Sequence, residues 1–413
     1  MKKASVLLIV FVVGLAAISA PSLYVQPVKA LYSVVEIDIN ADGSITPSDA
    51  PITNVGNSTY TLTDEVNITA HYGYSPAGIR IKRSNITFNG NGHILTGHGG
   101  NCFYLEGPPE VGNVTIENST AKGFDICLYL GGSYNNVIRG NTFSGSGVNS
   151  NVRLQGAGNN TFIGNVITNG GWGVEMGYAG PDNTFIENYI ANNTGWTIGW
   201  HLGGGGAHFY HNVIGGSIAA MYDPACTWDN GYPSGGNYWI GYVSPDKFSG
   251  LYQNITGGDG IGDTPKALDA DDVDHYPLLL LNVGNVSQTP PMDNVQPTDA
   301  VTVNATVAHH FPLEQVILNC TYTNGTGTWT TTINMTNLED DIWSGVIPPF
   351  PIGTNMTYAI IAQDNSGTSV NSKNQGYTFE YPVVPEFPTI ALLPILFVAT
   401  LFAALAFRRK RIK

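Results

Sequence analysis

The chain has 413 residues, with 50 glycines, 21 tyrosines and only 12% charged residues. This length exceeds one ordinary globular core, and the composition excludes a long-helix protein, which would need far more Lys, Glu, Ala and Leu. The formal net charge of −14, from 31 acidic and 17 basic residues, opposes binding to phosphate backbones. We therefore expect an all-β chain of short strands and tight turns that does not bind nucleic acid.

The N-terminus has the features of a secretory signal. Two lysines precede an apolar run at 4–20, and residues 28–30 offer a small-residue cleavage site. We expect residues 1–30 to be removed, so that the mature chain begins near Leu31, with cleavage after Ala20 as an alternative. The remainder of the chain is then exported.

An internal repeat predicts the fold of the first domain. Four strings align without gaps over their centres, and they place one asparagine, flanked by apolar columns, every 23 or 24 residues. With one further member upstream, this column consists of Asn118, Asn141, Asn165, Asn188 and Asn212. Because stacked coils of short strands enclose one continuous core, the repeat predicts a parallel β-helix over residues 31–285. Asparagines at one turn can then form a hydrogen-bonded ladder along the axis.

A second set of columns alternates apolar with polar residues, as expected of strands with one face in the core. The outward members are Tyr104, Tyr129, Arg153 and Glu175. Rings and hydrogen-bonding groups along one flat sheet suit the binding of sugars, although ordinary cross-strand packing explains the same row. Cys102 and Cys127 fall just before two of these strands, on positions predicted to face outward, where their Cα atoms can lie within disulfide range.

An acidic stretch follows the last repeat and is a candidate calcium site. Its carboxylates are Asp259, Asp263, Asp269, Asp271 and Asp274. Carboxylate and backbone oxygens are the ligands that Ca²⁺ selects. The EF-hand pattern is not matched, and a solvated acidic cap at the end of the β-helix is the alternative.

Residues 228–280 resemble the closing segment of the NosD-type β-helix family. The resemblance is carried by Gly236-Asn237-Tyr238-Trp239, by DGIGDTP at 259–265 and by DHYPL at 274–278. It implies an extracytoplasmic right-handed parallel β-helix of the pectin-lyase-like fold. For the founding members of the family it also implies an accessory role in maturing a copper enzyme.

The copper role does not transfer to this chain on its residues. A copper site needs His, Cys or Met side chains that converge within bonding distance. The only three histidines that fall within one short stretch of sequence are His201, His208 and His211, and a run of four glycines separates the first from the others. We expect these to be turn and surface histidines.

The pattern changes from about residue 289 to 382. Short strings alternate polar with apolar residues and are separated by turns such as Asn324-Gly325. This pattern predicts a β-sandwich, and it resembles the immunoglobulin-like or fibronectin type III-like modules of surface proteins. The resemblance implies a spacer that holds the β-helix away from a membrane.

Residues 385–413 have the features of a membrane anchor. The apolar run at 389–407 is long enough to cross a hydrocarbon core of about 30 Å, and the basic cluster at 408–413 is expected to stay cytoplasmic. With Pro385-Glu386-Phe387, the tail resembles the sorting signals that archaeosortases process, which implies exchange of the tail for a lipid. A plain single-pass helix is the alternative, and both place the protein on the outer face of the membrane.

Three functions fit these features. The first is a non-enzymatic surface module that binds or displays, with polysaccharide as the expected ligand and other surface proteins as further partners. The second is a polysaccharide lyase, hydrolase or epimerase, which needs a base and a charge sink that a lone Arg153–Glu175 pair does not supply. The third is copper handling as in NosD.

Fourteen Asn-x-Ser/Thr sequons are candidate glycan sites.

Overall fold

A computed structural model describes most of the chain between the two terminal segments. The described residues are 31–69, 77–105, 107, 110–145, 147–204, 206–219, 226–269, 271–339, 341–365, 368–373, 377 and 379–385. The predicted signal peptide at 1–30 and the expected membrane span at 389–407 lie outside these residues. Within them, every regular element is a strand, and none is a helix long and apolar enough to cross a membrane.

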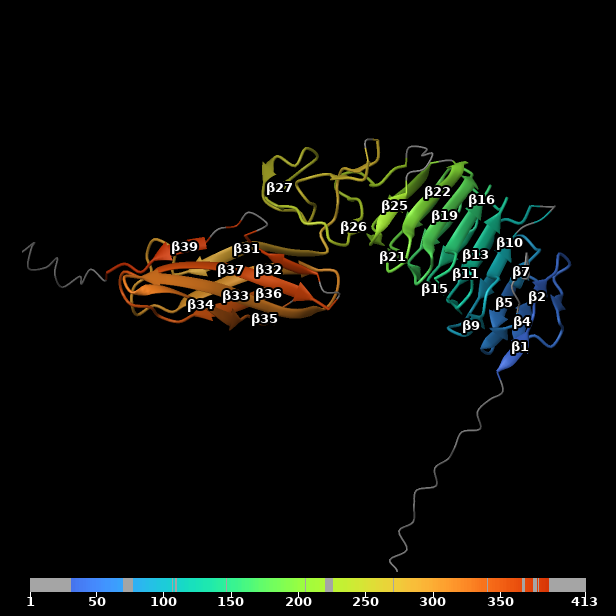
Figure 1. The fold of residues 1–413 in the computed structure, drawn as a ribbon, viewed down its shortest axis with the longest axis horizontal. Coiled ribbons are helices and arrows are strands. Elements are labelled where there is room, and N and C mark those ends of the chain that lie inside the picture. Colours follow the sequence, from blue (N-terminus) through green and yellow to red (C-terminus); the bar gives the residue numbers. More distant parts are fainter. Residues whose placement is uncertain are drawn as a thin grey trace, which may run out of the picture. The chain divides into compact units, whose positions relative to one another are not determined.

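Three sheets wind around one axis and form a β-helix (Figure 1). Sheet A contains, in spatial order, β1 (Tyr32–Val34), β6 (Val66–Ile68), β9 (Ile94–Gly97), β12 (Thr120–Lys122), β15 (Thr142–Ser144), β18 (Val166–Thr168), β21 (Tyr189–Ile190), β24 (Val213–Ile214) and β26 (Tyr238–Trp239). Sheet B contains β25 (Ser217–Ala219), β22 (Trp196–Gly204), β19 (Trp172–Ala179), β16 (Ser150–Gln155), β13 (Ile126–Gly131), β10 (Asn101–Leu105), β7 (Ala77–Ile81), β2 (Ile37–Ile39) and β3 (Ile45–Thr46). Sheet C contains β23 (Ala207–Tyr210), β20 (Asn183–Ile186), β17 (Thr161–Ile163), β14 (Val137–Arg139), β11 (Val114–Glu117), β8 (Ile86–Asn89), β5 (Thr59–Leu62) and β4 (Ile52–Val55). Neighbouring strands pair in parallel except at the N-terminal end, where β2–β3 and β4–β5 are antiparallel.

The core of the β-helix is a stack of large side chains from sheet C. Phe162, Phe185 and Phe209 occupy one register position and are fully buried. Their rings stack with centroids 4.5 and 4.7 Å apart, and Trp228 continues the stack at 4.6 Å. These separations are close to the strand spacing of a β-sheet, so each coil buries its ring against the rings of its neighbours.

A buried ladder of polar side chains runs beside this stack, at the turn between sheets C and A. In each rung the side-chain oxygen of one residue accepts a hydrogen bond from the backbone N–H of the residue one coil earlier, at 2.8 to 3.1 Å. The rungs are Asn141, Asn165, Asn188, Asn212, Asn237 and Asp274. The ladder satisfies backbone groups that the turn would otherwise leave unpaired in the core.

The ladder departs from the predicted column at its first member. Ser119, not Asn118, faces Asn141, because its N–H donates to the Asn141 Oδ1 at 3.0 Å. Pairing of Glu117 with Arg139 fixes this register. Asn118 instead has a φ of 51°, a left-handed turn conformation that asparagine tolerates. This coil is one residue shorter than the sequence alignment assumed.

The predicted disulfide is not formed. Cys102 and Cys127 are free thiols and are fully buried, whereas the alternation had placed them on the outer face. In β10, Cys102 and Phe103 are both buried, so the strict alternation breaks at the start of the strand. Burial raises the pKa of both thiols above its ordinary value.

The segment after the last full coil covers the end of the β-helix core. Two short antiparallel pairs belong to it, β27 (Phe248–Ser249) with β28 (Ile255–Thr256), and β29 (Lys266–Ala267) with β30 (Val273–Asp274). Trp228 and Trp239 are nearly fully buried here, at 1% and 5% exposure. They keep water from the end of the ring stack.

Residues from Leu281 onward form two antiparallel sheets with a separate apolar core. The first sheet contains β31 (Leu281–Thr289), β32 (Val301–His309), β36 (Ile342–Ile347) and β35 (Thr336–Glu339). The second contains β34 (Gly327–Asn334), β33 (Leu313–Asn324), β37 (Asn355–Asp364), β38 (Ser369–Asn371) and β39 (Phe379–Pro382). Strand β32 alternates buried with more exposed residues, as the sequence pattern predicted. Strand β31 begins before the predicted start at residue 289, with three buried residues in a row.

Candidate functional site

The outward row of sheet B is one continuous line of polar and aromatic side chains. Strand pairing places its members in register from one coil to the next. In spatial order the row consists of Asp38, Arg80, Tyr104, Tyr129, Arg153 and Glu175. Gly199 follows Glu175 in register and leaves that end of the row without a side chain. The four residues singled out from the sequence are therefore immediate neighbours.

The row is longer than the sequence repeat indicated, because Arg80 and Asp38 extend it. Arg80 lies 24 residues before Tyr104, and Ile79 and Ile81 flank it with the same apolar alternation. This spacing and alternation in the sequence could have identified Arg80 as a member of the row. Asp38 precedes Arg80 by 42 residues, since the hairpin of β4 and β5 lengthens the first coil, so no fixed period reveals it.

The two tyrosines stack on each other at the centre of the row. Their ring centroids are 4.9 Å apart and their planes differ by 9°. Because they follow each other along the axis, Tyr104 and Tyr129 cover one ring face of each other and present their edges outward. The remaining ring faces point toward Arg80 and Arg153, so the row offers ring edges and hydroxyls rather than an open aromatic platform.

Each charged residue of the row forms an ion pair, either within the row or with a neighbour on the same face. The Arg153 guanidinium lies 2.7 Å from the Glu175 carboxylate, which also accepts a hydrogen bond from the Ser150 hydroxyl. At the other end, Arg80 lies 2.5 Å from Glu36. The paired bases and acids on this face are Arg80, Lys82 and Arg153 with Glu36, Asp38 and Glu175.

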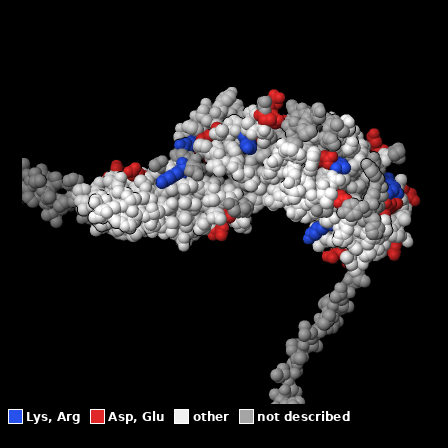
Figure 2. Space-filling view, viewed as in Figure 1, with Lys and Arg blue, Asp and Glu red and all other residues white. Residues whose placement is uncertain are grey.

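This face of sheet B consequently carries no excess of either charge. Acidic and basic side chains also lie beside each other on the face of the molecule drawn in Figure 2, with no extended patch of one sign. Burial raises the pKa of the Glu36 carboxyl, whereas the positive charge of Arg80 beside it lowers that pKa in part. A surface of this kind can hydrogen-bond a neutral ligand without attracting polyanions.

The predicted calcium carboxylates do not converge on one point. Asp263 accepts hydrogen bonds from the N–H groups of Lys247 and Phe248, and Asp269 accepts from those of Asp271 and Asp272. In the described part of the chain, no group of three or more His, Cys, Asp or Glu side chains is placed to hold a metal ion. The calcium prediction is therefore not supported. These carboxylates instead satisfy the backbone of the end segment.

Asp259 and Asp274 have the same structural role. Asp259 accepts a hydrogen bond from the Ile261 N–H at 3.2 Å. Asp274 is fully buried and ends the asparagine ladder, accepting from the Asn237 N–H and the Trp239 indole N–H, both at 2.8 Å. Burial of the Asp274 carboxylate raises its pKa to about 7, against the lowering effect of these hydrogen bonds.

The end segment should therefore lose stability as the pH rises. Asp274 binds its proton more tightly in the folded protein, so its contribution is complete below the ordinary value of 3.8 and is lost through about 7. We expect the free energy of unfolding to fall over this window by at most about 4 kcal/mol. In urea unfolding between these pH values, the free energy of unfolding of Asp274→Asn should fall less with pH than that of the wild type. The exposed Asp271→Asn should show the same pH dependence as the wild type. A profile of Asp274→Asn as steep as that of the wild type would contradict this role.

The histidines do not assemble a copper site. His208 lies 3.9 Å from Asp182, with 45% of its side chain exposed. His211 contacts the Ser234 carbonyl oxygen at 2.7 Å, and because that oxygen only accepts, the ring Nε2 is the donor. The His201 side chain lies outside the described residues. The donor set that copper requires is thus not brought together by the described histidines.

Comparison with known protein families identifies the β-helix. A family model described as "Periplasmic copper-binding protein (NosD)" matches residues 36–244, just over half of the 413 residues. The match covers the three sheets from β2 to β26 and includes the whole outward row of sheet B. No curated protein matches the chain.

Proposed function

This chain belongs to the NosD family of right-handed β-helix proteins, and from that premise we propose that it is an extracytoplasmic protein that binds polysaccharide without cleaving it. The proposed site is the outward row of sheet B. The observation that carries the proposal is the unbroken register of hydrogen-bonding side chains in this row. A glycan lying along the axis would meet one such group in each coil.

The paired charges of the row favour a neutral glycan. Arg80 and Arg153 each lie within 2.7 Å of a carboxylate oxygen, so neither has an unopposed charge to offer an acidic sugar. Their N–H groups and the tyrosine hydroxyls can still bond sugar hydroxyls at the rim of the contact. Ring edges of Tyr104 and Tyr129 add apolar contact area, as in other sugar-binding surfaces.

Binding without cleavage agrees with the surroundings of Glu175. A general base must reach the proton that it removes, but this carboxylate is held by Arg153 and Ser150. Asp38, the other acid of the row, lies five register positions away from it. A lyase, hydrolase or epimerase would need a second group near Glu175 that the described neighbours do not supply.

The remaining parts of the chain would hold this binding surface on the cell. We propose that the two antiparallel sheets after Leu281 form an immunoglobulin-like spacer and that residues 385–413 anchor the protein to the membrane, directly or through a lipid. A copper-handling role, as the family description names, is the second candidate function. Copper titration of the full-length protein, followed by the spectrum of bound Cu(II), tests it directly.

Truncation of the stacked tyrosines tests the proposed site. Neutral and acidic polysaccharides are screened for binding to the full-length protein, and the strongest ligand is then titrated calorimetrically. We expect Tyr104→Ala and Tyr129→Ala each to weaken binding about tenfold, because each loses an aromatic contact worth about 1.4 kcal/mol. The matched control is Tyr252→Ala, which removes a tyrosine that is 79% exposed and lies in the end segment.

The same titrations separate the competing functions. Binding that Tyr104→Ala and Tyr252→Ala weaken equally would remove the outward row as the site. Appearance of shorter or unsaturated oligosaccharides during incubation would replace the binding role with an enzymatic one. Binding of acidic glycans alone would contradict the charge argument.

A further inference from the structure

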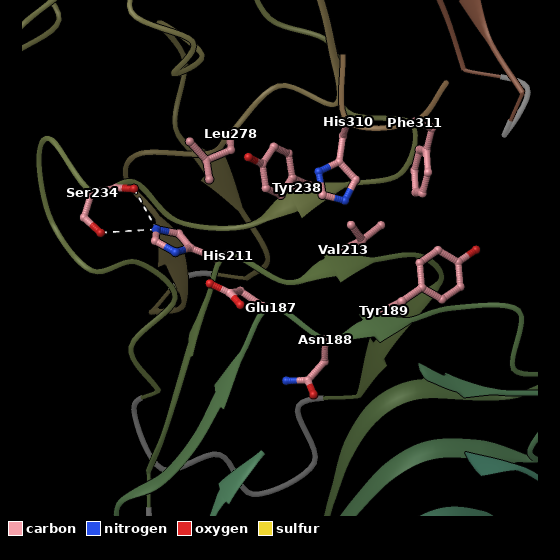
Figure 3. A pocket seen from close by; sticks show the side chains of 10 residues that line it. All are labelled: Glu187, Asn188, Tyr189, His211, Val213, Ser234, Tyr238, Leu278, His310 and Phe311. Carbon is pink, nitrogen blue, oxygen red and sulfur yellow. Dashed lines mark hydrogen bonds between the residues drawn. The ribbon is translucent and has the colours of Figure 1, made fainter. Parts of the chain in front are cut away.

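A pocket with four aromatic rings is lined by residues of sheet A, of the end segment and of the turn after β32 (Figure 3). Its volume is about 510 Å³, within the range of small-molecule sites. The rings belong to Tyr189 of β21, Tyr238 of β26, His310 and Phe311. None of these residues belongs to the outward row, so the pocket is a separate site.

The rings stand around the pocket at steep angles. Phe311 is nearly perpendicular to His310, with centroids 4.9 Å apart and an interplanar angle of 88°. It is also nearly perpendicular to Tyr189, at 6.3 Å and 81°. Tyr238 lies 4.7 Å from His310 and extends the aromatic wall (Figure 3). Phe311 thus packs edge to face with His310 and with Tyr189, so the four rings form one contiguous aromatic wall of the pocket. Aromatic rings attract organic cations through their π faces.

The backbone fixes these rings in place. The His310 N–H donates to the Leu280 carbonyl oxygen at 2.9 Å, which ties the turn after β32 to the end segment. Tyr238 forms a parallel bridge with Leu278, two residues before that carbonyl. These main-chain contacts hold the backbones of His310 and Tyr238 next to the end segment.

A carboxylate completes the lining. Glu187 has a φ of 56° and stands on the exposed outer side of the turn, where Figure 3 shows it beside His211. No ion pair of Glu187 is formed with any described residue. Burial lowers the pKa of His310, so this ring is uncharged at neutral pH and does not repel a cation.

We propose that this pocket binds an organic cation of the trimethylammonium type. The cation would lie in the pocket against this aromatic wall, with Glu187 beside His211 as its counter-charge. An organic cation suits this lining because aromatic rings and one carboxylate make up much of it, and the His211 Nε2 is already bonded to the Ser234 carbonyl oxygen. The same head group occurs on a free solute and on a lipid, and the experiment includes both.

Choline and its uncharged isostere, 3,3-dimethyl-1-butanol, provide the test on the full-length protein by calorimetry or ligand-detected NMR. We expect choline to bind and the isostere to bind at least about tenfold more weakly, because the two share a shape but only choline carries the charge. Phe311→Ala and Glu187→Gln should each weaken choline binding about tenfold. The matched controls are Phe248→Ala and Glu110→Gln, both at exposed positions of the described chain.

Vesicles distinguish the two sources of the head group. Capture of phosphatidylcholine vesicles that choline displaces would indicate a lipid, and binding of choline without vesicle capture would indicate a free solute.

Equal binding of choline and the isostere, or full choline binding by both Phe311→Ala and Glu187→Gln, would overturn the proposal. Because Glu187→Gln keeps the size of an exposed side chain, its result does not depend on the folding of Phe311→Ala. Loss of glycan binding in the Tyr104 variant with choline binding retained would confirm that the two sites are independent.

Discussion

Asn165→Ala should destabilise the β-helix by about 3 to 5 kcal/mol, one of the two largest effects that we expect of a single substitution. The Asn165 Oδ1 accepts from the backbone and side-chain amides of Asn141, at 3.0 and 3.1 Å. Its Nδ2 donates to the Ile138 carbonyl at 2.8 Å and to the Asn188 Oδ1 at 2.9 Å. Since the site is fully buried, alanine leaves these partners without water to replace the lost bonds.

Denaturant unfolding of the full-length protein measures this loss, and hydrogen exchange localises it. The amide of Asn141 should exchange much faster in the variant, because it loses its acceptor. Asn254→Ala is the matched control, since Asn254 is exposed and lies in the end segment. Equal unfolding midpoints for Asn165→Ala and Asn254→Ala would show that the ladder contributes nothing to stability.

Phe185→Ala should lower the free energy of unfolding by about 3 to 5 kcal/mol, for a different reason than Asn165→Ala. The ring is fully buried and stacks between Phe162 and Phe209, at 4.5 and 4.7 Å. Alanine leaves a cavity at the middle of the stack, and neighbouring coils can close it only by breaking their register. Phe185→Leu retains most of the volume and should cost less than about 1.5 kcal/mol.

The control for this substitution is Phe248→Ala. Phe248 is 39% exposed in the end segment, so its removal should change the free energy of unfolding by less than about 0.5 kcal/mol. Both variants are compared by thermal and urea unfolding. A loss of similar size in the two would mean that position 185 does not lie in a closely packed core.

The repeat made the β-helix predictable because its period equals the length of chain in one coil. Phe162, Phe185 and Phe209 recur every 23 or 24 residues, since one coil of chain separates neighbours in a stack. Alignment of the apolar columns placed Tyr104 and Tyr129, 25 residues apart, in one outward row, and the structure has them in register. A pattern that repeats in sequence is therefore sufficient to place side chains that face each other across a parallel ladder.

Local departures from the period were not predictable. The coil from Ser119 to Asn141 is 22 residues long, so counting 23 selected Asn118 in place of its neighbour. Cys102 faces inward beside Phe103, because the strand begins without strict alternation. Such one-residue shifts depend on the packing of each turn, which no periodic pattern records.

The roles of the acidic residues and the pocket depend on tertiary structure. A cluster of aspartates has the same sequence pattern whether its carboxylates bind a metal or backbone N–H groups. Only the structure shows that Asp274 accepts hydrogen bonds from Asn237 and Trp239. Tyr189 belongs to a coil of the β-helix, whereas Phe311 follows strand β32 of the antiparallel sheets, so the two are far apart in sequence. No local motif could therefore indicate that their rings line one pocket.

Cysteine cross-linking tests the central claim most directly, namely that successive coils lie in register and make sheet B one continuous surface. Tyr104→Cys with Tyr129→Cys places two thiols on paired positions of adjacent strands. Such strands lie about 4.8 Å apart, whereas positions two coils apart lie beyond the roughly 7 Å limit of a disulfide. Upon oxidation, peptide mapping should find the 104–129 bridge and no bridge in Tyr104→Cys with Arg153→Cys. A bridge in the second pair and none in the first would contradict the register on which the fold and the proposed site both depend.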